Sequence, residues 1–304
     1  MALILPAYAK LNLTLDALGV RPNGYHDIDS VMQTISLHDL ILVERSDCRV
    51  LDVVGRPIEG ENLVLTAARE LEGASGKALP FTIRLFKRIP LGAGLGGGSA
   101  DVAAFLRAAN QLYNLELSPA QLVAIGAEIG QDVPFFLEGG TARATGLGST
   151  VTPLQPVPSS WRFLVVWPPI QVSTRAVYQA LDGSQPSARR TPALVEALRG
   201  PHPEPPPTLP SPQRGEEKSA VEISSHLFGN DLEPTSRRLF PQLDDAINRL
   251  RQITPDLHMT GSGGAVFARF EGSRDAAKAL TQARELGFEA WVCRPVGGGQ
   301  QGSR

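Results

Sequence analysis

The first segment of the chain alternates between apolar and polar residues. One face of an extended segment would carry the apolar residues Ala7, Ala9, Leu11, Leu13, Leu15 and Ala17. The other face would carry Tyr8, Lys10, Asn12, Thr14 and Asp16. A period of two is typical of a strand that buries one face and leaves the other in water. The pattern therefore predicts a half-buried strand, which ends before a turn at residues 22–24.

The same periodicities predict strands and helices along the rest of the chain. Apolar or alternating runs predict strands at 30–37, 40–45, 81–86, 163–167, 265–270 and 290–296. Helical spacing predicts helices from an Asn62 cap to Glu72, from a Ser99 cap to Tyr113, at 119–129, at 174–181, at 236–253 and up to about 286. Ser118-Pro119 is a typical helix start, and Gly130 is a typical end.

The order of these elements predicts an α+β protein with two domains. We expect an N-terminal domain at 1–155 and a C-terminal domain at 156–296. Residues 199–220 have seven prolines among their first fourteen positions, which predicts a disordered or extended insertion in the second domain. The tail at 297–304 is rich in glycine and polar residues and is also expected to be disordered.

Composition excludes several classes of function. The 304 residues carry a net charge of −2, so we expect neither a nucleic acid nor a membrane surface as partner. Cys48 and Cys293 lie far apart, which predicts neither a disulfide framework nor a zinc site. No leader-like or membrane-spanning segment is apparent, and a cytoplasmic location is expected.

A glycine-rich segment provides the strongest chemical signal. Five glycines occupy the seven positions 92–98, between a predicted strand and a predicted helix. Glycines allow backbone N–H groups to approach a phosphate closely, and the start of a helix adds partial positive charge. The segment therefore predicts a phosphate-binding loop.

Two common phosphate motifs fit this segment poorly. Gly92, Gly94 and Gly97 satisfy the G-x-G-x-x-G spacing of nicotinamide-dependent oxidoreductases, but the preceding strand alternates instead of being apolar on both faces. In a P-loop alignment, Gly98 stands where the phosphate-binding lysine belongs. Neither motif explains the segment well.

The whole string PLGAGLGGGSAD at 90–101 resembles the ATP-binding motif of the GHMP kinases. AYAKLNLTL near the N-terminus and MTGSGGAVFA at 259–268 resemble the first and third motifs of that family. The stretches GYHDIDSVMQTISLHD, GQDVPFF and FGNDLE resemble one branch, which phosphorylates a hydroxyl of an acceptor carrying a cytidyl diphosphate. The resemblance implies a two-domain kinase with its active site between the domains, ATP as phosphoryl donor and Mg²⁺.

The resemblance also implies roles for individual residues. Asp132 is the candidate base for the hydroxyl proton, and Lys10 would keep it ionised and stabilise developing charge. Ser99 is a candidate Mg²⁺ ligand, although it could serve only as a helix cap. Asn12, Tyr25, His26, Thr174 and Tyr178 are expected to contact the acceptor, with Tyr178 equally compatible with a core position. The residues expected at ATP are Asn62, Pro90, Leu91, Gly92, Ala93, Gly94, Leu95, Gly96, Gly97, Gly98, Ser99 and Ala100.

Three alternatives stay open at this point. The protein could be a GHMP kinase for another small alcohol, a nicotinamide-dependent oxidoreductase, or a ligand sensor without catalysis. Lys10 and Asp132 together argue against the sensor. The protein is expected to act as a monomer or weak homodimer on a small-molecule substrate.

Overall fold

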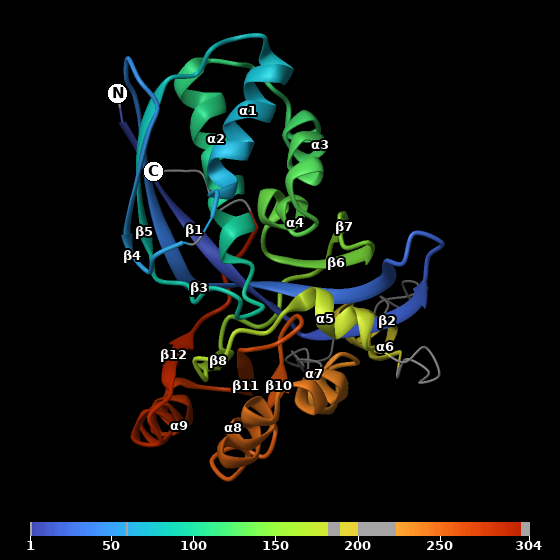
Figure 1. Ribbon diagram of the computed structural model, residues 1–304. Coiled ribbons are helices and arrows are strands. Elements are labelled where there is room, and N and C mark those ends of the chain that lie inside the picture. The colour runs from blue at the N-terminus through green and yellow to red at the C-terminus, as the bar shows by residue number, and fades with distance from the viewer. Residues whose placement is uncertain (1, 59, 182–188, 200–222, 299–304) are drawn as a thin grey trace, which may run out of the picture.

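The computed structural model describes residues 2–58, 60–181, 189–199 and 223–298. Within them, the chain forms two sheets with helices packed against each (Figure 1). The first sheet contains β1 Ala2–Asn12, β2 Thr14–Val20, β3 His26–Arg45, β4 Val50–Gly55, β5 Phe81–Lys87, β6 Thr141–Gly146, β7 Thr150–Pro153 and β9 Gly229–Asn230. The second contains β8 Arg162–Trp167, β10 His258–Met259, β11 Val266–Phe270 and β12 Glu289–Cys293.

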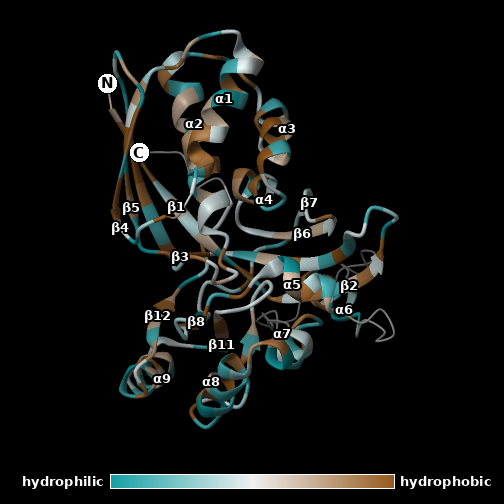
Figure 2. Cartoon of the chain, viewed as in Figure 1, coloured by the Kyte–Doolittle hydropathy of each residue, from teal (hydrophilic) through white to brown (hydrophobic). Residues whose placement is uncertain are grey.

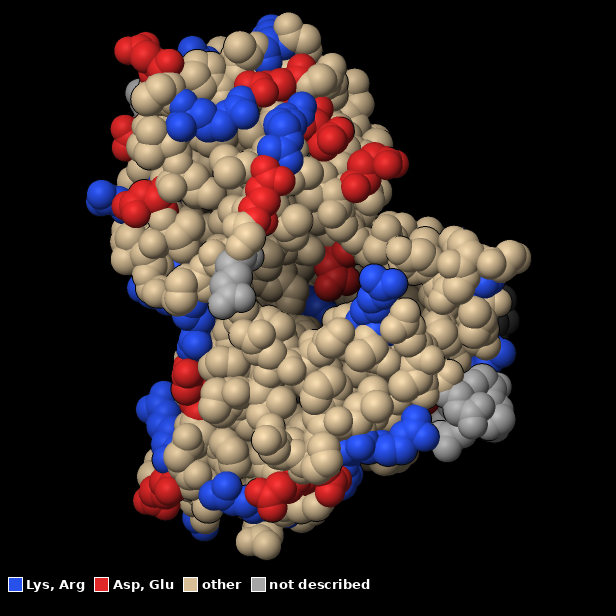
Figure 3. All heavy atoms as spheres, in the orientation of Figure 1, with Lys and Arg blue, Asp and Glu red and all other residues tan. Residues whose placement is uncertain are grey.

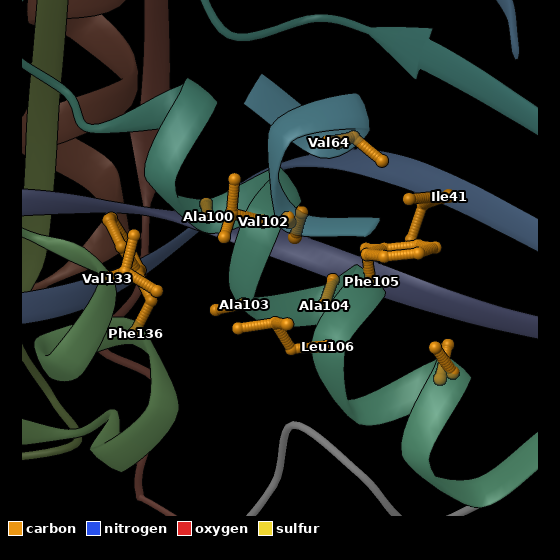
Figure 4. Packing of buried hydrophobic residues seen from close by; sticks show 14 of the residues in the cluster. Ile41, Val64, Ala100, Val102, Ala103, Ala104, Phe105, Leu106, Val133 and Phe136 are labelled. Carbon is orange, nitrogen blue, oxygen red and sulfur yellow. The ribbon is translucent and has the colours of Figure 1, made fainter. Parts of the chain in front are cut away.

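Helices cover one face of the first sheet. These are α1 Leu63–Ser75, α2 Gly97–Tyr113, α3 Pro119–Ile129 and α4 Val133–Glu138. The long helix α2 buries Val102, Phe105 and Leu106 in the core shown in Figure 4, where Ile41 of β3 and Val64 of α1 meet them. The apolar positions along these elements are visible as brown segments in Figure 2.

The second sheet lies between the first sheet and a layer of helices. Alternate residues of β8 face opposite ways: Phe163 and Val165 pack with Leu11 and Ile35 of the first sheet. Leu164 and Val166 pack instead with apolar residues of the outer helices. The helices of this half are α5 Thr174–Gln179, α6 Arg190–Arg199, α7 Glu233–Leu239, α8 Pro241–Arg251 and α9 Ser273–Glu285. Because buried residues of both halves form one cluster, the predicted boundary at 155/156 stays a prediction.

Several sequence predictions are confirmed. Asn62 caps α1 through Val64 N, and Ser118 forms a capping box with Gln121 at the start of α3. The strands near 81–86, 163–167 and 265–270 are present. The dinucleotide-binding alternative is wrong, because β5, the strand that leads into the glycine segment, pairs antiparallel with β3, whereas a dinucleotide-binding sheet is built from parallel strands.

Other predictions are wrong for identifiable reasons. The first strand is interrupted at Leu13, and its polar face is buried. Asp132 lies beside Lys10, and Thr191 bonds both Thr14 and Asp16. The strands predicted at 30–37 and 40–45 are one strand, β3, which pairs with β1, β2, β5 and β6. Pro241 divides the helix predicted at 236–253 into α7 and α8. Except for Arg199 at the end of α6 and Gly297–Gly298, the predicted insertion and tail lie outside the described residues.

A cluster of buried charges supports the start of α2. Lys87 donates hydrogen bonds to Asp39 and, at 2.7 Å, to Asp101 of α2. The Lys87 and Asp39 side chains are fully buried, and that of Asp101 is 2% exposed. Burial opposes the charge of Lys87, but the two carboxylates together raise its pKa above the ordinary value. Burial raises the pKa of Asp101, whose Oδ1 has no hydrogen-bond partner.

We expect Lys87→Met to destabilise the fold strongly, because it leaves two buried carboxylates without a cation. Breaking a buried ion pair by removing one partner costs about 3–5 kcal/mol. Urea unfolding measures this loss, and Lys77→Met, at an exposed site, is the control. Adding Asp101→Asn to Lys87→Met should recover part of the loss. A free energy of unfolding within about 1 kcal/mol of the wild type would contradict the assigned role.

Candidate active site

Lys10 lies near the end of β1 and is nearly buried. It is 3% exposed, and its Nζ is 3.8 Å from Oδ2 of Asp132. Burial lowers the pKa of the Lys10 ammonium, and the Asp132 carboxylate partly opposes this effect. The Asp132 side chain keeps 31% of its surface exposed. A buried cation therefore lies beside a carboxylate that a substrate can reach.

Asp132 is held at a junction between two helices. It follows α3 and is the residue before the first turn of α4, in which Pro134 occupies an early position. Its carbonyl accepts a hydrogen bond from Phe136 N at 3.2 Å. Its carboxylate does not cap α4. The backbone is thus fixed while the side chain is left for Lys10 and a ligand.

Asn12 connects Lys10 to the second half of the chain. Its Oδ1 accepts a hydrogen bond from Lys10 Nζ, and its Nδ2 donates to Ser30 Oγ at 2.8 Å. Its backbone N–H donates to Thr260 Oγ1 at 2.9 Å. Thr260 opens the glycine-rich loop 260–264. Asn12 therefore orients the lysine and is not an exposed strand residue.

The glycine-rich segment 92–98 packs directly against the loop 260–264. Ala265 N donates to Ala93 O at 3.0 Å, and Lys10 N donates to Leu95 O at 3.1 Å. A Cβ at Gly94 would lie 2.3 Å from Thr260 O, so no larger residue fits there. The segment is therefore fixed from both halves of the protein.

The helix α2 starts with backbone groups that no side chain caps. It begins at Gly97, and its N-cap Gly96 has a φ of 71°, which favours glycine. The prediction that Ser99 is the N-cap is wrong, because Ser99 lies inside the first turn. Uncapped N–H groups at a helix start form a ready anion site.

The side-chain amide of Asn62 has a donor without a hydrogen-bond partner among the described residues. Its Oδ1 accepts from Val64 N at 2.9 Å, whereas its Nδ2 is buried without a partner among the described residues. A buried donor of this kind needs an acceptor. Leu63, the next residue, would lie 3.4 Å from a Cβ at Gly98. Asn62 is thus close to the glycine segment. The side chains of Pro90, Ala93 and Leu95 are buried, so this part of the segment offers its backbone.

Two aromatic rings, those of His26 and Tyr178, lie against each other near Asp132. The rings of His26 and Tyr178 are 5.3 Å apart at an angle of 41°, and neither His26 nitrogen has a hydrogen-bond partner among the residues that the structure describes. Tyr25 is 63% exposed. Burial, with the Asp132 carboxylate adding to it, raises the pKa of Tyr178 above its ordinary value. Tyr178 thus contacts His26 and lies within electrostatic reach of the Asp132 carboxylate.

Thr174 lies on α5, the same helix as Tyr178, and links it to the loop 260–264. Its Oγ1 shares a 2.6 Å hydrogen bond with Ser262 Oγ. Figure 3 shows a hollow between the upper and lower halves of the molecule, with an acidic and a basic side chain at its floor. Among the described residues, no three His, Cys, Asp or Glu side chains are grouped to hold a metal.

Sequence reasoning missed the Lys87 cluster, although a signal was present. The alternation of FTIRLFK places Lys87 on the same face as Phe81, Ile83 and Leu85. That face is the core, so a lysine there requires buried carboxylates.

In the described part of the chain, no helix is both long and apolar enough to cross a bilayer.

Known proteins share both the sequence and the fold of this chain. Residues 62–140 match the GHMP kinases N terminal domain, and residues 216–288 match the GHMP kinases C terminal model. The 4-diphosphocytidyl-2-C-methyl-D-erythritol kinase of Carboxydothermus hydrogenoformans is 38% identical over 96% of each chain. That of Moorella thermoacetica is 40% identical over 97% of this chain and 99% of its own.

Solved structures give the same picture. A crystal structure of 4-(cytidine 5'-diphospho)-2C-methyl-D-erythritol kinase has a TM-score of 0.76 and 34% identity, covering 97% of this chain and 100% of that one. Homoserine kinase from Cytophaga hutchinsonii has a TM-score of 0.64 at 18% identity, covering 99% of this chain and 96% of its own, and shares the fold. The chain therefore belongs to the GHMP kinase family, in the branch of the 4-diphosphocytidyl-2-C-methyl-D-erythritol kinases.

Proposed function

We propose that this protein transfers the γ-phosphoryl group of ATP to the 2-hydroxyl of 4-diphosphocytidyl-2-C-methyl-D-erythritol, in the cytoplasm, as a monomer or weak homodimer. The observation that carries the proposal is the Lys10–Asp132 pair, with its 3.8 Å separation and its partly exposed carboxylate. Phosphoryl transfer needs positioned phosphates, neutralised charge and a group to accept the hydroxyl proton. The described residues offer a candidate for each.

Asp132 is the proposed base. Its carboxylate accepts the proton of the acceptor hydroxyl as the oxygen attacks phosphorus. Lys10, whose Cγ lies 3.2 Å from a Cβ position at Gly96, stands between Asp132 and the glycine segment. Its ammonium would stabilise negative charge on the alkoxide and the transferring group. Asn12 holds Lys10 in this orientation.

The uncapped first turn of α2 is the proposed phosphate site, with Asn62 beside the adenine. Ser99 fits the role of Mg²⁺ ligand, because its hydroxyl lies in that first turn and does not cap the helix within the described part of the chain. Mg²⁺ takes many of its ligands from phosphate and water, and would supply charge neutralisation on the phosphates. His26, Tyr178 and the exposed Tyr25 would contact the cytosine, and Thr174 the polyol.

A panel of alcohols tests the proposal as a whole. We expect ATP turnover with the cytidyl diphosphate acceptor to exceed that with free 2-C-methylerythritol, homoserine or mevalonate by at least about 10²-fold in kcat/KM, since a site built for polar groups rejects analogues that lack them. Phosphorus NMR of the product identifies the modified hydroxyl. Faster turnover of an acceptor without the cytidyl group would favour another small-molecule kinase.

Asp132→Asn should lower kcat by a factor of about 10² or more, because the amide cannot accept the proton. Binding of ATP and acceptor, measured by calorimetry, should change little. Glu128→Gln, an exposed carboxylate change on α3, is the control and should retain full activity. A near-normal kcat for Asp132→Asn would mean that another group is the base.

Gly98→Val should weaken ATP binding without unfolding the protein. A Cβ at Gly98 would meet only Leu63, at 3.4 Å, whereas one at Gly96 would lie 2.6 Å from Phe136 and one at Gly97 2.9 Å from Ile89. Gly98 is therefore the glycine to probe. We expect the ATP KM to rise at least roughly tenfold, about 1.4 kcal/mol, with the melting temperature and the acceptor KM nearly unchanged.

Gly73→Val, where a Cβ would meet nothing within 4 Å, controls for valine in a helix. Normal ATP binding by Gly98→Val would argue against phosphate contact at this turn.

A further inference from the structure

The proposed acceptor carries a diphosphate that needs a positive partner. This inference rests on the proposed function and asks which residue supplies that charge. A diphosphate loses strong hydration when it enters a site, and it is bound well only where cations or oriented donors replace the water. The cations around His26, Tyr178 and Asp132 are the candidates.

The nearby cations on the first sheet are already paired with aspartates. Lys10 lies 3.8 Å from Asp132, within the reacting pair. The other pairs on these strands are Arg21 with Asp27 at 2.5 Å and Arg143 with Asp29 at 2.7 Å. Arg190, at the start of α6, is paired with Asp231 at 3.3 Å. A guanidinium already neutralised by a carboxylate gains less from a second anion. These arginines are poor candidates.

Arg175 on α5 differs from all of them. It is exposed and makes no ion pair or side-chain hydrogen bond within the described part of the chain. Figure 1 shows α5 between the first sheet and α7, at the junction of the two halves. Its charge is therefore uncommitted at the place where the two halves meet.

The contacts at the two ends of α5 define the position of Arg175 relative to the site. At one end Thr174 bonds Ser262, in the loop whose Thr260 bonds Asn12 beside Lys10. At the other end Tyr178 lies against His26. Residues three apart are neighbours on a helix surface, so Arg175 and Tyr178 share a flank of α5. Arg175 thus stands between the end that meets the hydroxyl site and the end that meets the proposed cytosine site.

We propose that Arg175 binds the diphosphate of the acceptor and so contributes to selecting a nucleoside diphosphate over an uncharged nucleoside. In the acceptor, the diphosphate joins the cytidine to the polyol, and Arg175 occupies the corresponding position between Tyr178 and Thr174. The planar guanidinium can give two parallel hydrogen bonds to phosphate oxygens.

Calorimetry with cytidine and with CDP tests the proposal without catalysis. We expect Arg175→Gln to lower the affinity for CDP at least roughly tenfold, about 1.4 kcal/mol. The affinity for cytidine should change less than about twofold. Arg175→Lys should recover part of the CDP affinity, because lysine keeps the positive charge but cannot donate the two parallel hydrogen bonds of a guanidinium. The ATP KM should not change.

Arg274→Gln is the matched control, because Arg274 is an exposed and unpaired arginine on α9 within the described residues. It should bind CDP as the wild type does. The proposal is overturned if Arg175→Gln binds CDP normally, or if its ATP KM rises while CDP binding is unchanged, which would assign the arginine to the donor. A wild type that binds neither cytidine nor CDP would overturn the proposed function, and this inference with it.

Discussion

The close contact between two glycine-rich segments is the constraint on which the site depends. A Cβ at Gly94 would lie 2.3 Å from Thr260 O, and one at Gly264 would lie 3.0 Å from Gly92 O. At this separation the backbones bond directly, through Ala265 N and Ala93 O. The contact joins the two halves of the chain next to Lys10 and α2. The glycines therefore allow the two halves to pack closely, in addition to their proposed role at the phosphates.

Two buried lysines on this framework are used in opposite ways. Lys87 has two buried carboxylates, which raise its pKa and commit its charge to the fold. Lys10 has one partly exposed carboxylate, and burial lowers its pKa. A cation neutralised by two buried carboxylates attracts an anionic ligand weakly. A cation with a single, partly exposed carboxylate partner is stabilised when an anionic ligand binds. The difference in pairing separates the structural lysine from the catalytic candidate.

The sequence predicted what depends on neighbouring residues and missed what depends on distant ones. The Asn62 and Ser118 caps are local hydrogen bonds and are confirmed. The open polar face expected of the first strand is wrong, because residues far along the chain lie against it: Asp132 beside Lys10, and Thr260 beside Asn12. Ser99 failed as a cap because Gly96 takes a left-handed conformation one turn earlier than the pattern suggested. The motif resemblance brought Lys10 and Asp132 together, which periodicity alone could not do.

The two sides of the site draw on different parts of the sequence. The proposed donor side is built from backbone N–H groups of a glycine segment, which a motif records in consecutive letters. The proposed acceptor side is built from single side chains on β1, around the start of β3, just before α4 and on α5, which share no spacing. Homoserine and mevalonate kinases keep this fold at 14–18% identity. A backbone site survives most substitutions around it, while an acceptor site made of scattered side chains changes with each one. Substrate choice in this fold is therefore expected to reside in elements such as α5, outside the glycine motif.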